Sequence, residues 1–227
     1  VYPSVCGTGT LSLSFTFTSS SQYLLYVSQA TTADTTFAFG SVEQSSYGNS
    51  FYAYIDSCPT SARGIEYRVC TKKGTEVYSS YASTSSEYLY ISSSAITKRT
   101  IYYIQARTYA YDSSYNKVYS GWSDKKYFIS RPDVKTSATK KTLSTHSVTL
   151  KWYKVTGATK YIVYCSTKQS SGYKKVGTTT KTSLKVTKFK NKTISFTSKK
   201  YFKIIAVTKV GGKTVKSTPY YAYAQVY

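Results

Sequence analysis

The sequence predicts an all-β protein built from two tandem β-sandwich domains. Tyr, Thr, Val, Ile and Phe, which suit the pleated surface of a sheet, are frequent, and tyrosine alone occurs 27 times. Apolar and hydroxyl-bearing residues alternate along several short runs, as strands with one buried face do. Turn residues separate these runs at the spacing typical of sandwiches.

The first predicted element is an N-terminal hairpin extension over residues 1–30. From Leu11 to Thr18, four apolar residues alternate with four hydroxyl-bearing residues, which indicates a strand with one buried face. A polar turn over 19–22 leads to a second apolar run over 23–28. We expect this hairpin to pack on the first domain or to complete it.

Two domains follow, at residues 31–131 and 132–227. The predicted strands of the first are 36–42, 50–55, 64–71, 76–81, 87–91, 100–111 and 117–128. Those of the second are 147–153, 160–166, 173–178, 183–186, 199–210 and 213–224, with a tight turn at Gly211-Gly212. The linker is predicted at Arg131-Pro132-Asp133, because proline restrains the preceding residue and interrupts strand pairing.

The two halves also resemble each other. When Tyr67 is laid on Tyr161, the strand around each has a similar pattern, and residues 102–106 then match residues 202–206. Each half continues through a hairpin to a last strand that carries serine. This predicts a two-unit repeat of roughly 95 residues, a size that suits a sandwich domain.

Charge divides the chain at the same place. Residues 132–227 contain twenty lysines, no arginine and one acid, Asp133, for a net charge of +19, whereas residues 1–131 carry only +3. Such a domain should attract anionic polymers, and we take Lys174, Lys175, Lys199 and Lys200 as the candidate contacts. The alternative is a lysine coat that only keeps the domain soluble. Sequence motifs for specific nucleic-acid binding are missing.

The four cysteines are widely spaced. They form no Cys-x-x-Cys pair, and the single His146 does not complete a zinc site of usual spacing. Cys58 and Cys70 fall near opposite ends of a sandwich, too far apart to bridge. We therefore expect at most one disulfide, joining Cys6 to either Cys58 or Cys70, and a free, buried Cys165.

The run Val148–Tyr164 resembles strands B and C of bacterial fibronectin type III domains, which are immunoglobulin-like sandwiches. The resemblance covers about 132–227 and is weaker over 31–131, where Gly121-Trp122-Ser123-Asp124 is similar to the start of strand G. It implies that Arg107 stacks on Trp122, although two unrelated surface residues are the alternative. The implied core positions are Trp152, Tyr161, Val163, Phe202, Ile204 and Ala206 in the second domain, and Tyr102, Ile104 and Ala106 in the first.

Catalytic chemistry is not expected. General acid–base catalysis needs placed carboxylates, and the second domain holds a single acid. The eight acids of the first half are scattered, and glycine-rich phosphate loops are missing, so we expect neither catalytic residues nor a metal or other cofactor. No stretch approaches the roughly 20 apolar residues of a transmembrane helix.

The many tyrosines allow two interpretations. Many tyrosines lie on the outward phase of strands, such as Tyr103 and Tyr164, or in loops and terminal strands, such as Tyr221 and Tyr223. Their rigid apolar rings with a polar tip suit binding of protein or sugar. Alternatively, they make favourable cross-strand pairs and bind nothing.

Together these features predict a non-enzymatic interaction or adhesion module, and the family resemblance implies an extracellular, secreted or wall-associated bacterial protein, often Gram-positive. The basic second domain would contact an anionic cell-wall or host polysaccharide, or a surface protein. The alternative is a passive spacer in a larger secreted carbohydrate-active enzyme.

Overall fold

The computed structural model describes residues 37–46, 48–92, 94–96, 99–135 and 143–226. All secondary-structure elements within these ranges are β-strands, and they belong to one compact unit, Thr31–Tyr227. The predicted hairpin over 1–30 lies outside the described residues. The fold class is confirmed for the described residues, which form two tandem fibronectin type III-like β-sandwiches.

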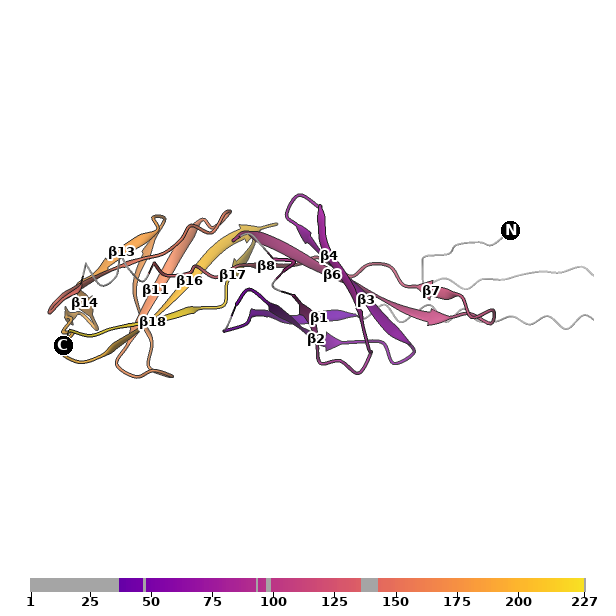
Figure 1. Cartoon of the computed structure of the whole chain (residues 1–227), viewed down its shortest axis with the longest axis horizontal. Coiled ribbons are helices and arrows are strands. Elements are labelled where there is room, and N and C mark those ends of the chain that lie inside the picture. The colour runs from indigo at the N-terminus through magenta and orange to yellow at the C-terminus, as the bar shows by residue number, and fades with distance from the viewer. Residues whose placement is uncertain (1–36, 47, 93, 97–98, 136–142, 227) are drawn as a thin grey trace, which may run out of the picture. The chain divides into compact units, whose positions relative to one another are not determined.

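The first sandwich consists of two antiparallel sheets (Figure 1). The smaller sheet has the order β1 (Ala38–Gln44), β2 (Phe51–Ser57), β5 (Tyr88–Ile91). The larger has the order β4 (Glu76–Ala82), β3 (Gly64–Thr71), β6 (Ile101–Tyr111), and β6 also pairs with β7 (Lys117–Tyr119) and β8 (Lys126–Ile129). A three-stranded sheet facing a larger sheet is the arrangement of immunoglobulin-like domains.

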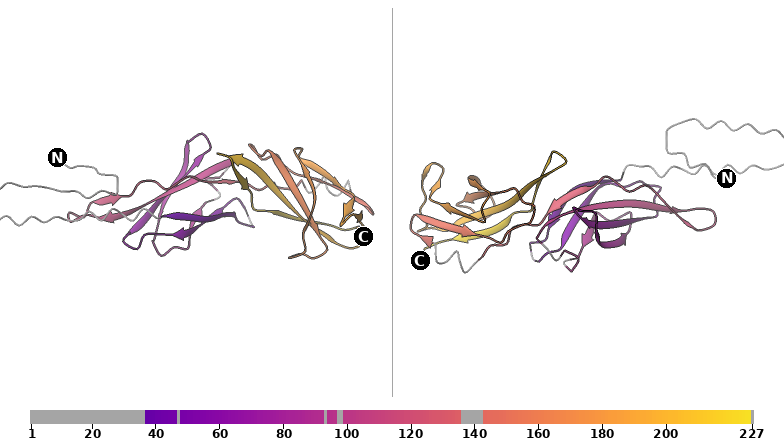
Figure 2. Two further views of the ribbon diagram at one scale, coloured as in Figure 1. Left: turned by 180° about the vertical axis from the view of Figure 1, so that it is seen from behind. Right: turned by 90° about the horizontal axis from the view of Figure 1, so that it is seen from above.

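The second sandwich repeats this plan, as two further views show (Figure 2). Its smaller sheet has the order β13 (Ser183–Val186), β10 (Ser147–Lys151), β9 (Leu143–Ser144). Its larger sheet has the order β12 (Lys174–Thr179), β11 (Lys160–Ser166), β16 (Lys200–Val210), and β16 also pairs with β17 (Lys213–Lys216) and β18 (Tyr220–Ala224). A separate short hairpin joins β14 (Lys188–Phe189) to β15 (Lys192–Thr193).

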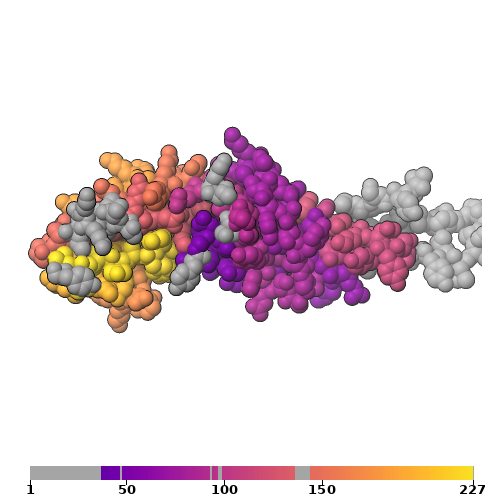
Figure 3. All heavy atoms as spheres, viewed as in Figure 1, coloured from indigo at the N-terminus to yellow at the C-terminus, as the bar shows by residue number. Residues whose placement is uncertain are grey.

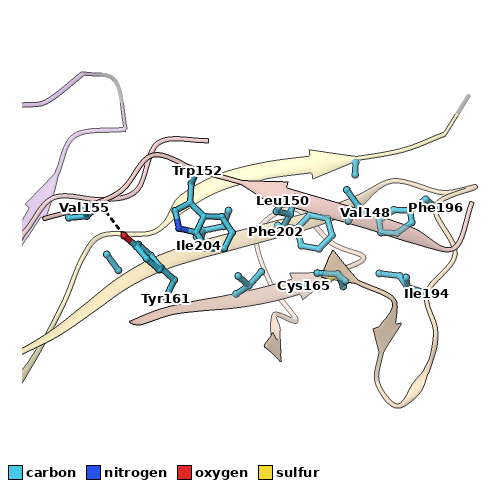
Figure 4. Packing of buried hydrophobic residues seen from close by; sticks show 14 of the residues in the cluster. Val148, Leu150, Trp152, Val155, Tyr161, Cys165, Ile194, Phe196, Phe202 and Ile204 are labelled. Carbon is cyan, nitrogen blue, oxygen red and sulfur yellow. Dashed lines mark hydrogen bonds between the residues drawn. The ribbon is translucent and has the colours of Figure 1, made fainter. Parts of the chain in front are cut away.

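The core of the second sandwich forms because alternate residues of facing strands point inward. Trp152 packs against Tyr161 with ring centroids 5.3 Å apart, and the Tyr161 hydroxyl accepts a 2.9 Å hydrogen bond from the Val155 amide (Figure 4). Burying each large apolar side chain of this kind contributes about 1.5–3 kcal/mol. All nine residues named above as core positions are buried, none more than 3% exposed: Tyr102, Ile104, Ala106, Trp152, Tyr161, Val163, Phe202, Ile204 and Ala206.

The internal repeat is visible in the strand pairing. Tyr67 pairs with Ala106 in the first sandwich, and Tyr161 pairs with Ala206 in the second. The last strand of each sandwich also makes the same hydrogen bond with the central strand. The Ala106 amide donates to the Ser123 hydroxyl and the Ala206 amide donates to the Ser217 hydroxyl, both at 3.0 Å.

Those serines explain why two predicted strands are each divided. Residues 117–128 form β7 and β8, and residues 213–224 form β17 and β18. Where Ser123 and Ser217 accept from the main chain of the central strand, a side chain takes the place of a carbonyl and the regular ladder is interrupted. Pro219 also lacks the amide hydrogen that a continuous strand needs.

The predicted turn at Gly211-Gly212 is confirmed. Val210 pairs directly with Lys213, and the two glycines have φ values of 54° and 76°. Positive φ at both central positions defines the type I′ turn of two-residue hairpins, and glycine adopts it without steric cost.

The predicted linker is tightly bound rather than open. Arg131 is buried, and its guanidinium donates to the carbonyl oxygens of Ser45 at 2.6 Å and Ser46 at 3.2 Å. Beyond Pro132, Val134 forms a β-bridge with Trp152. The sequence did not predict this, because a single buried arginine that donates to carbonyl groups leaves no periodic signal.

Candidate functional site

The exposed face of the larger sheet in the second sandwich carries alternating lysine and tyrosine. Lys175 of β12 is opposite Tyr164 of β11, which is opposite Lys203 of β16. Lys203 is in turn opposite Tyr221 of β18. Residues directly opposite in neighbouring strands share a face, so these four form one row across the sheet.

In the first sandwich, arginine side chains cover the corresponding face of the larger sheet. The Arg68 guanidinium lies 4.1 Å from the Trp122 ring centroid, and that of Arg107 lies 4.5 Å from it. Arg107 also forms a 2.6 Å ion pair with Glu66. The predicted stacking of Arg107 on Trp122 is confirmed, and both cations are occupied within the domain.

The second sandwich has apolar residues at the two positions that correspond to these arginines. By the alignment of Tyr67 with Tyr161, Arg68 corresponds to Ile162, and the pairing of Ala106 and Ala206 makes Arg107 correspond to Val207. No arginine occurs after Arg131. The guanidinium–indole stack of the first domain therefore has no counterpart in the second.

A groove of about 650 Å³ lies beside Val207, the counterpart of Arg107. We call it the lysine–threonine groove. Its lining consists of Thr159, Lys160, Thr178, Thr179, Thr180, Lys181, Val207, Lys209 and Thr214. Lys160, Lys181 and Lys209 are exposed, and the Thr159 side chain is held by a 3.1 Å hydrogen bond to the Val207 carbonyl. A groove lined by three exposed lysines and several threonines suits an anionic ligand.

A second groove, of about 540 Å³, lies at the other end of β16. We call it the tyrosine groove. Its lining consists of Gln169, Ser170, Tyr173, Lys199, Tyr201, Tyr221, Ala222 and Tyr223. Burial, together with the neighbouring Tyr221, raises the pKa of Tyr173, so its hydroxyl stays protonated and donates at 2.7 Å to the Gln169 carbonyl.

The four lysines predicted as polyanion contacts differ in exposure. Lys174 and Lys175 are exposed on β12, and Lys199 lines the tyrosine groove with its Nζ 4.7 Å from the Tyr223 centroid. Lys200 is only 7% exposed, and its ammonium donates to the Ser198 hydroxyl at 2.6 Å and carbonyl at 3.0 Å. The prediction that Lys200 contacts a polyanion is therefore wrong, because this side chain is buried.

Sequence reasoning missed the three lysines of the lysine–threonine groove. Lys160 and Lys209 lie on the outward phase of β11 and β16, so strand alternation was the signal that pointed to them. Lys181 lies in the turn between β12 and β13, where alternation says nothing.

The three described cysteines, Cys58, Cys70 and Cys165, form no disulfide with one another. Cys70 and Cys165 are buried, and Cys58 is half-buried. Burial raises the pKa of the Cys165 thiol to about 12, although the nearby Lys200 acts in the opposite direction. Cys6 lies outside the described residues, so its pairing with Cys58 or Cys70 stays a prediction.

The titratable residues of the described ranges do not gather into a metal site, since no group of three or more His, Cys, Asp or Glu residues lies together there. The ring Nδ1 of His146 lies 3.2 Å from the Ile194 carbonyl, which fixes the ring beside the main chain. In the described part of the chain, no helix is long and apolar enough to cross a membrane.

Comparisons with known proteins give only distant likenesses. No family model and no curated protein matches the chain. A two-domain fibronectin type III segment from chicken tenascin is similar at 12% identity and a TM-score of 0.33, covering 84% of this chain and 97% of that one. The FN1–FN3 domains of chicken CNTN1 are similar at 10% identity and a TM-score of 0.29, covering 83% and 64%. The fold assignment therefore depends on the strand order and register described above.

Proposed function

We propose that this chain is a non-enzymatic, extracellular interaction module of a bacterium, whose second sandwich binds anionic polymers through the exposed face of its larger sheet. The observation that carries the proposal is the lysine–threonine groove, where three exposed ammonium groups line one depression. In the first sandwich Arg107, the counterpart of the groove residue Val207, stacks on Trp122 instead.

Charge balance supports this use of the face. Asp133 is the only acid among residues 132–227, so nearly all twenty lysines lack a carboxylate of their own domain to pair with. Cations that no carboxylate neutralises keep their attraction for external anions, and the summed field draws such ligands to the surface. Lysine also pairs with anions as a flexible point charge, which suits a polymer of irregular geometry.

A non-catalytic role follows from the same shortage of acids. General acid–base catalysis needs a carboxylate or histidine placed beside the reacting bond. The two grooves are lined by lysine, threonine, tyrosine, glutamine, serine, valine and alanine, without a carboxylate or a histidine. This lining supports binding rather than bond cleavage.

Salt-gradient chromatography on a sulfated polysaccharide resin tests the proposal with the whole 227-residue chain. The test variant replaces Lys160, Lys181 and Lys209 by glutamate. The control replaces three other exposed lysines by glutamate and so changes the net charge equally. These are Lys185 on β13, Lys188 on β14 and Lys192 on β15. By analogy with nucleic acids, each lost contact should reduce the salt dependence of log K by about 0.7–0.9.

We expect the parent chain to be retained at low salt and released as ionic strength rises. The groove variant should elute at clearly lower salt than the control variant. Equal losses in the two variants would show that net charge alone, and not the groove, causes retention. No retention of the parent on any polyanion would favour the passive spacer.

A further inference from the structure

Two tyrosine rings of the tyrosine groove remain open although they have cross-strand neighbours. Tyr223 is opposite Tyr201, and Tyr221 is opposite Lys203. Pairing of this kind normally covers part of each ring, yet Tyr221 is 55% exposed and Tyr223 is 60% exposed. Figure 3 shows the C-terminal residues, in yellow, on the surface of the second sandwich. The cross-strand explanation therefore does not account for these two rings.

Ammonium groups lie beside the same rings. The Nζ of Lys203 is 5.1 Å from the Tyr221 centroid and 4.2 Å from the Tyr173 centroid. The Nζ of Lys199 is 4.7 Å from the Tyr223 centroid. A ligand unit stacked on either tyrosine would place a negatively charged substituent within reach of a lysine.

The rim of the groove supplies hydrogen-bonding groups. Gln169 and Ser170, in the loop between β11 and β12, line it together with the tyrosine hydroxyls. The 2.7 Å hydrogen bond from the Tyr173 hydroxyl to the Gln169 carbonyl joins two residues within that loop. Amide and hydroxyl groups around a flat apolar plate match a ring that carries many hydroxyls of its own.

We propose that the tyrosine groove binds acidic polysaccharide, with uronic-acid rings stacking on Tyr221 and Tyr223 while Lys199 and Lys203 pair with the sugar carboxylates. This assignment rests on the proposed function and names its ligand class. The lysines favour an acidic over a neutral sugar, and the polar rim favours sugar hydroxyls over an uncharged hydrophobic partner. The absence of arginine from residues 132–227 weighs against nucleic acid, which arginine contacts bidentately at phosphate and guanine.

Isothermal titration of the 227-residue chain tests this with four probes of defined chemistry. Polygalacturonate carries uronic-acid rings, polyphosphate carries charge without rings, dextran carries rings without charge, and oligothymidylate carries bases. We expect the strongest binding to polygalacturonate when charge concentration and ionic strength are matched. The ring-removing variant is Tyr221→Ala with Tyr223→Ala, and the ring-keeping variant replaces both residues by Phe.

Loss of two stacking plates should weaken polygalacturonate binding by about tenfold or more and leave polyphosphate binding unchanged. The Phe variant should keep most of the affinity, because the rings remain. The matched control, Tyr111→Ala with Tyr115→Ala, removes two exposed tyrosines of the first sandwich and should change nothing.

The remaining outcomes separate this inference from the proposed function. Equal weakening toward polyphosphate, or no weakening by the Ala variant, would overturn the sugar assignment while the polyanion function stands. Preference for oligothymidylate would assign the groove to single-stranded nucleic acid instead. Failure to bind any of the anionic probes would overturn both proposals.

Discussion

Replacing Tyr161 by phenylalanine tests the packing of the second sandwich at a single atom. The Tyr161 hydroxyl accepts from the Val155 amide at 2.9 Å, and Val155 is fully buried. Without the hydroxyl, that amide is left without a partner inside the core, at a cost of about 1–3 kcal/mol in unfolding free energy. With a urea m-value of roughly 1–3 kcal/mol/M, the unfolding midpoint should fall by roughly 1 M.

Tryptophan fluorescence during urea unfolding provides the assay. The chain has two tryptophans, and Trp152 is buried 5.3 Å from Tyr161, so a Trp122→Phe background leaves Trp152 as the reporter of the second sandwich. The control is Tyr67→Phe, the repeat position, whose hydroxyl donates at 2.7 Å to the Tyr90 carbonyl of the first sandwich. An unchanged midpoint for Tyr161→Phe, or an equal shift of the Trp152 transition by the control, would refute the reasoning.

Three further predictions concern other sites. The raised pKa of Cys165 favours its neutral thiol in the folded state, so the second sandwich should lose stability as pH rises from about 9 toward 12. Iodoacetamide at pH 8 should label Cys165 only after unfolding, and labelling of the folded chain would contradict this. Gly64→Ala should destabilise the first sandwich by about 1–3 kcal/mol, because the added methyl group would overlap the Tyr109 ring, and an unchanged urea midpoint would disprove the overlap. Hydrogen bonds from Asn116 lower the pKa of Asp112, so an NMR titration should find its midpoint below 3.8, and a normal midpoint would show that this turn is open in solution.

Much of the fold was predictable because strand alternation is a local signal. The predicted ranges 64–71, 160–166 and 183–186 coincide with β3, β11 and β13. The divided last strands were not predictable in the same way. Ser123 and Ser217 interrupt them by bonding to residues of another strand, and such a contact depends on register rather than on local composition.

The candidate site was less predictable, since it depends on what lies side by side across strands. A bulge between Val163 and Tyr164 sets Lys175 opposite Tyr164, and no feature of the sequence announces it. The burial of Lys200, in contrast, was predictable from the sequence. This lysine lies two residues before Phe202, on the inward phase of β16, so alternation alone argued for its burial.

The length of β16 has a consequence for any chain-like ligand. One end of this strand contributes Tyr201 to the tyrosine groove, and the other contributes Lys209 to the lysine–threonine groove. Eight residue steps of about 3.3 Å hold the two sites about 26 Å apart within a single hydrogen-bonded strand. A short oligomer would occupy one site, whereas a polymer long enough to bridge both would gain avidity through effective concentration, so affinity should rise abruptly at a threshold chain length.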